Sequence, residues 1–162
     1  MLFEVTQRFT APPAAVLALF TDEAYYADLP EFSRVGRPAF VGKSVAGHRV
    51  TMKVRYRFTA DLPAGADKII DKQKLTWVEE TVYDLSALTA ASRLLPDNYP
   101  DRLSASARRT FTEAGGGTVA VTNGELKVRV RFVGGRVEAA IVDGLREHLG
   151  DEATLVNERL PG

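Results

Sequence analysis

The protein has 162 residues, no cysteine, and equal numbers of acidic and basic side chains, so its formal net charge is zero. This length predicts a single domain over residues 1–162, and the lack of cysteine excludes disulfides and thiolate metal sites. A neutral chain also lacks the basic excess that is typical of nucleic-acid-binding proteins.

The first residues carry no targeting pattern. Met1 to Phe9 alternate between apolar and polar side chains, and no basic segment is followed by an apolar run, so we expect no signal peptide. No apolar stretch approaches the ~20 residues that span a bilayer. We therefore expect a cytoplasmic protein without stable membrane insertion.

A strand and two short helices are predicted at the start of the chain. Residues 2–10 alternate with a period of two, which is typical of a half-buried strand. Two prolines follow and suit the first turn of a short apolar helix over residues 14–20. Thr21 or Asp22 then caps a second helix that ends near Leu29.

Short strands dominate the middle of the chain. Their predicted ranges are 34–42, 47–59, 74–84, 87–95, 102–113 and 118–132. Residues 87–95 have a composition that also suits a helix, and we assign a strand because the following segment needs a hairpin partner. Residues 62–71 read as a loop with a helical turn. In the last strand the apolar face changes phase at Asn123–Gly124, which predicts a β-bulge there.

The chain ends with the pattern of a long amphipathic helix over about 136–159. The residues that share its apolar face are Val137, Ile141, Leu145, Leu149, Leu155, Val156 and Leu160. Two polar residues, His148 and Glu152, interrupt this face one turn apart. A helix that follows a sheet and carries polar residues on its buried face is suited to closing a ligand cavity.

This order of elements predicts an α+β fold, in which one long helix packs across a curved antiparallel sheet. The segment Gly124–Glu138 resembles the last strand and helix entry of a bacterial branch of the START-like, or SRPBCC, superfamily. The resemblance extends over the whole chain in its order of elements. It implies the helix-grip fold: a seven-stranded curved antiparallel sheet wrapped around a long C-terminal helix, with two short helices after the first strand.

The same resemblance implies a hydrophobic cavity between the sheet and the terminal helix. Members of this superfamily bind lipids, sterols or polyketide-like compounds, and a minority catalyse reactions. No catalytic residue transfers to this chain, because no catalytic motif of the superfamily is present to match.

His148 and Glu152 are candidates for an acid–base pair, in which the carboxylate orients the imidazole. A structural ion pair explains the same spacing, and we favour that interpretation. The chain has only two histidines and no HExxH spacing, so we expect no metal and no cofactor. Arg109 shares the parity of apolar neighbours in its strand, and we expect it to be exposed because burying an unpaired arginine is costly.

The side chains predicted to contact a ligand share the inward faces of the long strands and of the terminal helix. They are His48, Met52, Val54, Tyr56, Trp77, Tyr83, Ile141, Gly144, Leu145, His148 and Glu152.

The leading hypothesis is a non-catalytic carrier or sensor of a small hydrophobic molecule that is lipid-like, sterol-like or polyketide-like. The first alternative is an enzyme of the cyclase or dehydratase type that uses His148 and Glu152. The second alternative is an interaction module that has no true ligand cavity.

Overall fold

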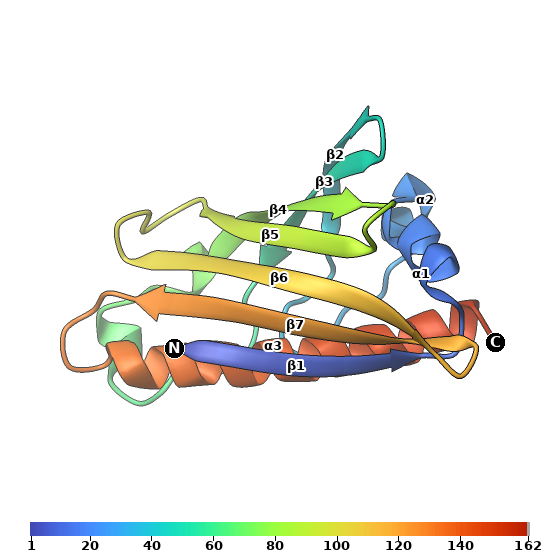
Figure 1. Ribbon diagram of the computed structural model, residues 1–162. Helices are drawn as coiled ribbons and strands as arrows, with labels where there is room; N and C mark the ends of the chain where they lie inside the picture. The colour runs from blue at the N-terminus through green and yellow to red at the C-terminus, as the bar shows by residue number, and fades with distance from the viewer. Residues whose placement is uncertain (162) are drawn as a thin grey trace.

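The computed structural model describes residues 1–161, which form one seven-stranded antiparallel sheet and a long C-terminal helix (Figure 1). In chain order the elements are β1 (Leu2–Phe9), α1 (Pro13–Phe20), α2 (Glu23–Ala27), β2 (Ala39–Ala46), β3 (Arg49–Arg57), η1 (Ala66–Lys68), η2 (Lys72–Lys74), β4 (Thr76–Asp84), β5 (Thr89–Pro96), β6 (Leu103–Ala114), β7 (Gly117–Val128) and α3 (Gly134–Arg159). The helix-grip arrangement predicted from the sequence is therefore present, including the strand assignment of residues 87–95.

The strand order in the sheet is β1-β7-β6-β5-β4-β3-β2. Strands β2 to β7 follow one another along the sheet as antiparallel neighbours, as expected for strands that are consecutive in the chain. In the β6–β7 turn, Gly115 and Gly116 have φ values of 59° and 83°, a conformation that glycine adopts without strain. The first strand lies beside the last, so β1 forms the edge of the sheet next to β7.

Helix α3 runs along one face of the sheet, nearest to β1 and β7, as Figure 1 shows. Helices α1 and α2 cover the end of the sheet near the C-terminus of α3. Asp22 caps α2 by accepting a hydrogen bond from the Ala24 amide at 3.0 Å. None of the helices in residues 1–161 is long and apolar enough to cross a membrane.

The core between these layers consists of two clusters of buried side chains. One cluster surrounds Phe20 of α1, whose ring centroid lies 6.0 Å from those of Phe9 and Tyr25. The other contains Phe58, Leu126 and Val137, beneath the first half of α3. Between these two clusters lies a space that apolar side chains do not fill.

The predicted strand over residues 34–42 is wrong at its start, because β2 begins only at Ala39. Residues 32–36 form a turn that is closed by an isolated bridge between Phe32 and Gly36, and Gly36 has a φ of 64°. Pro38, which lacks an amide hydrogen, then delays regular pairing. The register shift of the β2–β3 pair lies between Phe40 and Gly42.

The predicted bulge at Asn123–Gly124 is absent, because β7 pairs without interruption with both β1 and β6. The even-numbered side chains of β7 face inward along its whole length, and Thr118 and Thr122 occupy inward positions. Small polar residues on the buried face made the apolar pattern resemble a phase change. The strand also ends at Val128 rather than near Phe132, whose side chain is exposed.

Candidate ligand-binding site

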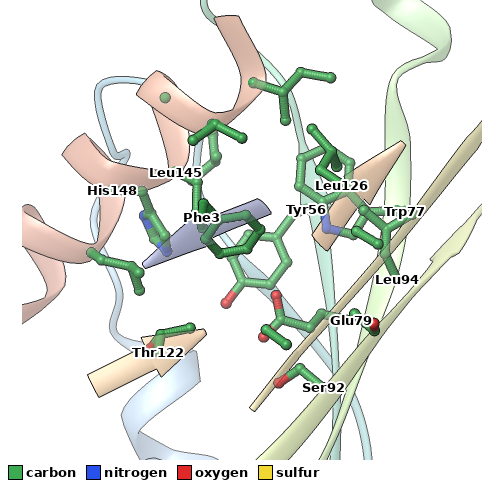
Figure 2. Close-up of a pocket in the computed structure, with 18 of the residues that line it drawn as sticks. Phe3, Tyr56, Trp77, Glu79, Ser92, Leu94, Thr122, Leu126, Leu145 and His148 are labelled. Carbon is green, nitrogen blue, oxygen red and sulfur yellow. The ribbon is translucent and has the colours of Figure 1, made fainter. Parts of the chain in front are cut away.

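A cavity of about 120 Å³ lies between α3 and the inward faces of the central strands, between the two core clusters (Figure 2). Its lining includes Phe3, Tyr56, Phe58, Trp77, Glu79, Ser92, Leu94, Ala105, Ala107, Arg109, Thr122, Leu126, Ile141, Gly144, Leu145, His148 and Glu152. A smaller space of about 20 Å³ adjoins it and is reached by Met52, Val54 and Tyr83. The two spaces share Tyr56, Glu79, Ser92, Arg109 and Glu152.

Strand alternation delivers these side chains to one space. On β4, Trp77, Glu79 and Tyr83 are separated by even steps and therefore project from the same face. The opposite wall comes from α3, where Leu145 and His148 are three residues apart on the side facing the sheet. The cavity is therefore lined by alternate residues of β4 on one side and by residues about one helical turn apart on α3 on the other.

One end of the cavity is apolar and aromatic. The rings of Tyr56 and Trp77 are stacked with centroids 6.0 Å apart and an interplanar angle of 18°. Leu126 and Leu145 lie on the same side of the space in Figure 2. A planar apolar group has flat aromatic surface to lie against here.

Arg109 and Glu152 form an ion pair at the other end, with 3.2 Å between Arg109 Nη1 and Glu152 Oε1. Arg109 Nε donates to Thr122 Oγ1 at 3.0 Å, and the guanidinium carbon lies 5.8 Å from the centre of the Phe20 ring. The expectation that Arg109 is exposed is therefore wrong, since its side chain is only 16% exposed. That expectation rested on the cost of burying an unpaired arginine, and this cost does not apply because Glu152 of α3 pairs with the guanidinium.

Glu79 projects into the cavity without a basic partner. Among residues 1–161, no side-chain nitrogen of lysine, arginine or histidine forms an ion pair with its carboxylate, which accepts one long hydrogen bond of 3.3 Å from Thr81 Oγ1. Burial raises the pKa of the Glu79 carboxyl above its usual range. The oxygens of Tyr56 and Glu79 turn toward the same region in Figure 2. Burial, followed by the charge of Glu79, raises the pKa of the Tyr56 hydroxyl.

His148 is buried, with 6% of its surface exposed, and its ring packs edge-on against Phe32 at 4.7 Å and Tyr56 at 5.7 Å. Its Nδ1 atom has no hydrogen-bond partner in the described part of the chain. Burial lowers the pKa of this imidazole, so the neutral form is favoured.

The predicted pair between His148 and Glu152 does not form, although both side chains face the sheet. The Oε1 atom of Glu152 instead accepts hydrogen bonds from Arg109 and from Gln7 Nε2, the latter at 3.0 Å. Gln7 Nε2 also donates to the carbonyl of Leu149 at 2.8 Å, which anchors α3 to β1. Glu152 is thus committed to a structural network rather than to orienting the imidazole.

We expect His148→Phe to flatten the dependence of stability on pH. A histidine whose folded-state pKa is lowered takes up its proton in the unfolded chain first, so stability falls as pH drops below the unfolded value of about 6.5. The wild type should therefore lose up to about 1.4 kcal/mol of unfolding free energy per pH unit over this window through His148, and the variant should lose less. Urea unfolding between pH 7.5 and pH 5 measures both slopes, and equal slopes would contradict the burial of this group.

The structure brings most of the predicted ligand-contacting residues to these two spaces, but His48 is an exception. His48 lies in the β2–β3 turn, before β3 begins at Arg49, and is exposed to solvent. His48 has the same parity as Val50 and Met52, but β3 begins one residue after it, so the strand does not carry its side chain inward. Val54 contacts the smaller space rather than the main one.

The sequence analysis missed five polar residues that line the cavity, namely Glu79, Ser92, Arg93, Ser106 and Thr122, and placed a sixth, Arg109, in solvent. Glu79 shares the parity of Trp77 and Tyr83, which were both recognised, so strand alternation alone was a sufficient signal. Ser92 and Thr122 gave no comparable signal, since small polar residues are as common on the outer faces of strands.

The cavity reaches the outer face of the sheet between β5 and β6. Pairing of these strands stops at Arg93–Ser106, although both strands continue beyond it. The exposed residues Arg93 and Ser106 and the half-buried Leu94 and Ala105 border the cavity at this point. Residues of both faces of the sheet therefore border the cavity between the unpaired strand ends, which form the β5–β6 opening.

Solved structures share this fold at low sequence identity. They include TTHA0849 from Thermus thermophilus, with a TM-score of 0.68, 19% identity and coverage of 98% of this chain and 96% of that one. The Zhui aromatase/cyclase from Streptomyces sp. R1128 has a TM-score of 0.68, 16% identity and coverage of 98% and 94%. A START superfamily protein from Mycobacterium smegmatis has a TM-score of 0.60, 14% identity and coverage of 98% and 99%.

These likenesses establish the START-like fold of the chain. Among curated proteins, none matches the sequence. A family model described as "Protein of unknown function (DUF2505)" matches residues 4–160. Because this match spans nearly the whole sequence, the chain belongs to the DUF2505 family.

Proposed function

We propose that the protein binds a small ligand with an apolar, ring-sized body in the cavity between the sheet and α3, as a carrier or sensor acting in the cytoplasm as a single domain. The observation that carries this proposal is the cavity itself, which has an aromatic end and a polar end within one space. A chain that needed only a stable core would fill this volume with side chains, because interiors are close-packed.

The size of the cavity limits the ligand. Sites for drug-sized molecules measure about 300–1,000 Å³, and an apolar cavity of about 150 Å³ holds one benzene ring. The main space of about 120 Å³ is therefore of the size of a single ring, and a short substituent has to extend into the adjoining space of about 20 Å³ or into the β5–β6 opening. A larger lipid-like or polyketide-like ligand requires the β5–β6 opening to widen.

The only tryptophan of the chain, Trp77, lines the cavity, so its fluorescence reports on occupancy. We expect 2-phenylethanol to change this fluorescence saturably in the wild type. Ala105→Phe should weaken binding about tenfold or more, because a phenyl group at this half-buried, inward-facing position takes up ligand space. Thr110→Phe on the same strand is the control, since Thr110 is exposed on the opposite face and borders neither space. Equal affinity in all three proteins would place binding elsewhere.

A second candidate function is acid–base catalysis on a bound ligand. The observation that favours it is Glu79, a carboxyl group whose pKa is raised by burial and which shares the cavity with the Tyr56 hydroxyl. A carboxyl group tuned upward in this way is suited to donating a proton near neutral pH. Mass spectrometry of compounds released from the wild type and from Glu79→Gln separates the candidates: a carrier releases from the variant either the same compound or none, whereas an enzyme releases a different compound from it, the unconverted substrate.

A further inference from the structure

The interior of the cavity contains one more carboxylate than it has cations. The buried charged groups that the described residues place there are Glu79, Glu152 and Arg109. Arg109 forms its ion pair with Glu152 and is held in place by Thr122. Burial raises the pKa of Glu79 and the charge of Arg109 partly offsets that rise, but one guanidinium cannot compensate two carboxylates. Glu79 is left as a carboxylate that faces the cavity with no basic side chain within ion-pair distance. When all three groups are ionised, the interior therefore carries one uncompensated negative charge.

A second arginine, Arg93, borders the cavity only at the β5–β6 opening and does not change this balance. Its side chain is 63% exposed, and its Nε donates to Glu80 Oε1 at 2.8 Å. Glu80 follows Glu79 on β4 and therefore projects from the opposite face of the sheet. The guanidinium of Arg93 is thus compensated and solvated outside the cavity.

Aromatic rings border the same space. Tyr56 and Trp77 form a stacked pair, and Phe3 and Phe58 add two further rings to the lining. The faces of aromatic rings attract cations, and this attraction strengthens when the cation is removed from water. An aromatic wall beside a single uncompensated carboxylate is the combination that recognises an ammonium group attached to an apolar body.

We propose that the ligand of this cavity is a small aromatic amine, whose ammonium group pairs with Glu79 and whose ring lies against Tyr56 and Trp77. This inference rests on the proposed ligand-binding function and specifies its chemical class. The His148 imidazole, which borders the same space and whose Nδ1 has no partner among the described residues, adds a second polar contact without adding charge.

The arrangement disfavours the two other common substituents of an aromatic ring. A carboxylate would lie beside Glu79 and Glu152, and the buried cation of the site, Arg109, is already bound to Glu152. An alcohol can hydrogen-bond to Glu79 or Tyr56 but leaves the buried negative charge uncompensated. Selectivity for the amine therefore comes from the charge of Glu79.

Three compounds of nearly equal shape test this inference: 2-phenylethylamine, 2-phenylethanol and phenylacetate. Their affinities are measured through Trp77 fluorescence and by calorimetry, with the wild type and Glu79→Gln. We expect the wild type to bind the amine about ten times more tightly than the alcohol, because only the ammonium group forms a buried ion pair with Glu79. Phenylacetate should bind most weakly, because its carboxylate is repelled by Glu79 and Glu152. In Glu79→Gln, which keeps the shape of the side chain without its charge, the amine and the alcohol should bind within about twofold of each other.

A pH series adds a readout that packing alone does not produce. Pairing with an ammonium group requires the Glu79 carboxyl to lose its proton, so amine binding should strengthen between pH 5 and pH 8 while alcohol binding changes little. The other titratable or charged groups around the two spaces are Tyr26, Tyr56, Tyr83, Arg93, Arg109, His148 and Glu152. The dependence is assigned to Glu79 only if Glu79→Gln removes it.

Each outcome has one meaning. If the alcohol binds the wild type as tightly as the amine, or if Glu79→Gln keeps the amine preference, the amine inference is wrong while the proposed function stands. If none of the three compounds shows saturable binding that Ala105→Phe weakens, the proposed function fails and this inference fails with it. The folding of Glu79→Gln is checked by thermal unfolding, and we expect it to be at least as stable as the wild type at pH 7, because a raised pKa of a carboxyl means that burial opposes its ionisation.

Discussion

Replacing Arg109 with methionine should lower the free energy of unfolding by about 3–5 kcal/mol, the largest effect that we expect from a change within the cavity. The side chains of Arg109 and Glu152 are 16% and 13% exposed, so water screens neither of them well. Without the guanidinium, Glu152 and Glu79 become two carboxylates in one space with no buried cation among the described residues. Urea unfolding at pH 7 measures the change.

The control for this variant is Arg108→Met, the neighbouring residue on the outer face of β6. Arg108 is exposed, and its substitution should change the unfolding free energy by no more than about 0.5 kcal/mol. The double variant Arg109→Met/Glu152→Met should recover a large part of the lost stability, because replacing a whole buried ion pair costs far less than removing one partner. A double variant less stable than Arg109→Met alone would contradict the assigned pairing.

Gly124→Ala should destabilise the protein by about 2–4 kcal/mol, because no space exists for a methyl group at this position. A Cβ atom on Gly124 would lie 2.4 Å from Cζ of the Phe3 ring and 2.8 Å from the backbone oxygen of Ser106. The Ser106 oxygen belongs to the backbone of the neighbouring strand β6 and cannot move away, and the buried ring of Phe3 can move only by entering the cavity that it lines.

The matched control is Gly150→Ala, where a Cβ atom would meet nothing within 4 Å. Gly150 lies inside α3 on its exposed side, so alanine should stabilise the helix by up to about 1 kcal/mol. Thermal unfolding should therefore shift in opposite directions for the two variants. A neutral effect of Gly124→Ala would show that Phe3 does not pack over the strand as described.

The stability cost of the site follows from its chemistry. The Nδ1 atom of His148 and the carboxylate of Glu79, which lack partners of suitable charge or geometry within residues 1–161, lie in a space that apolar side chains would fill more favourably. Buried polar groups of this kind are frequent at functional sites, and the ligand that we propose would supply the missing partner. The proposed amine would pair with the Glu79 carboxylate, whereas Glu79→Gln would remove the cost of burying its charge, so we expect the variant to be at least as stable as the wild type and to lose the preference for the amine.

Local periodicity was enough to predict most of the secondary structure of this chain. The alternation of residues 2–10 and the apolar stripe from Val137 to Val156 each depend on which face of one element is buried, and the structure confirms both. The same logic placed Tyr56, Trp77 and Leu145 on inward faces. The order of these elements, together with their resemblance to START-like proteins, predicted the fold without any contact being known.

Periodicity failed where the backbone departs from a regular element. His48 has the parity of an inward residue, but a turn carries it into solvent. Thr118 and Thr122 are polar residues that face inward, and they made the outward Val119 and Val121 look like the buried set. In both cases the pattern of apolar residues is only an indirect sign of burial, which the pairing of strands decides.

The partners of the charged residues were decided by the tertiary structure alone. Sequence spacing places Glu152 one turn from His148 on the same face of α3, which suggested a pair within the helix. In the folded chain, β1 and β6 bring Gln7 and Arg109 to that carboxylate from 145 and 43 residues away along the chain. A sequence determines which way a side chain points from its own helix or strand, but not which distant side chain meets it, because that depends on how the sheet curves around the helix.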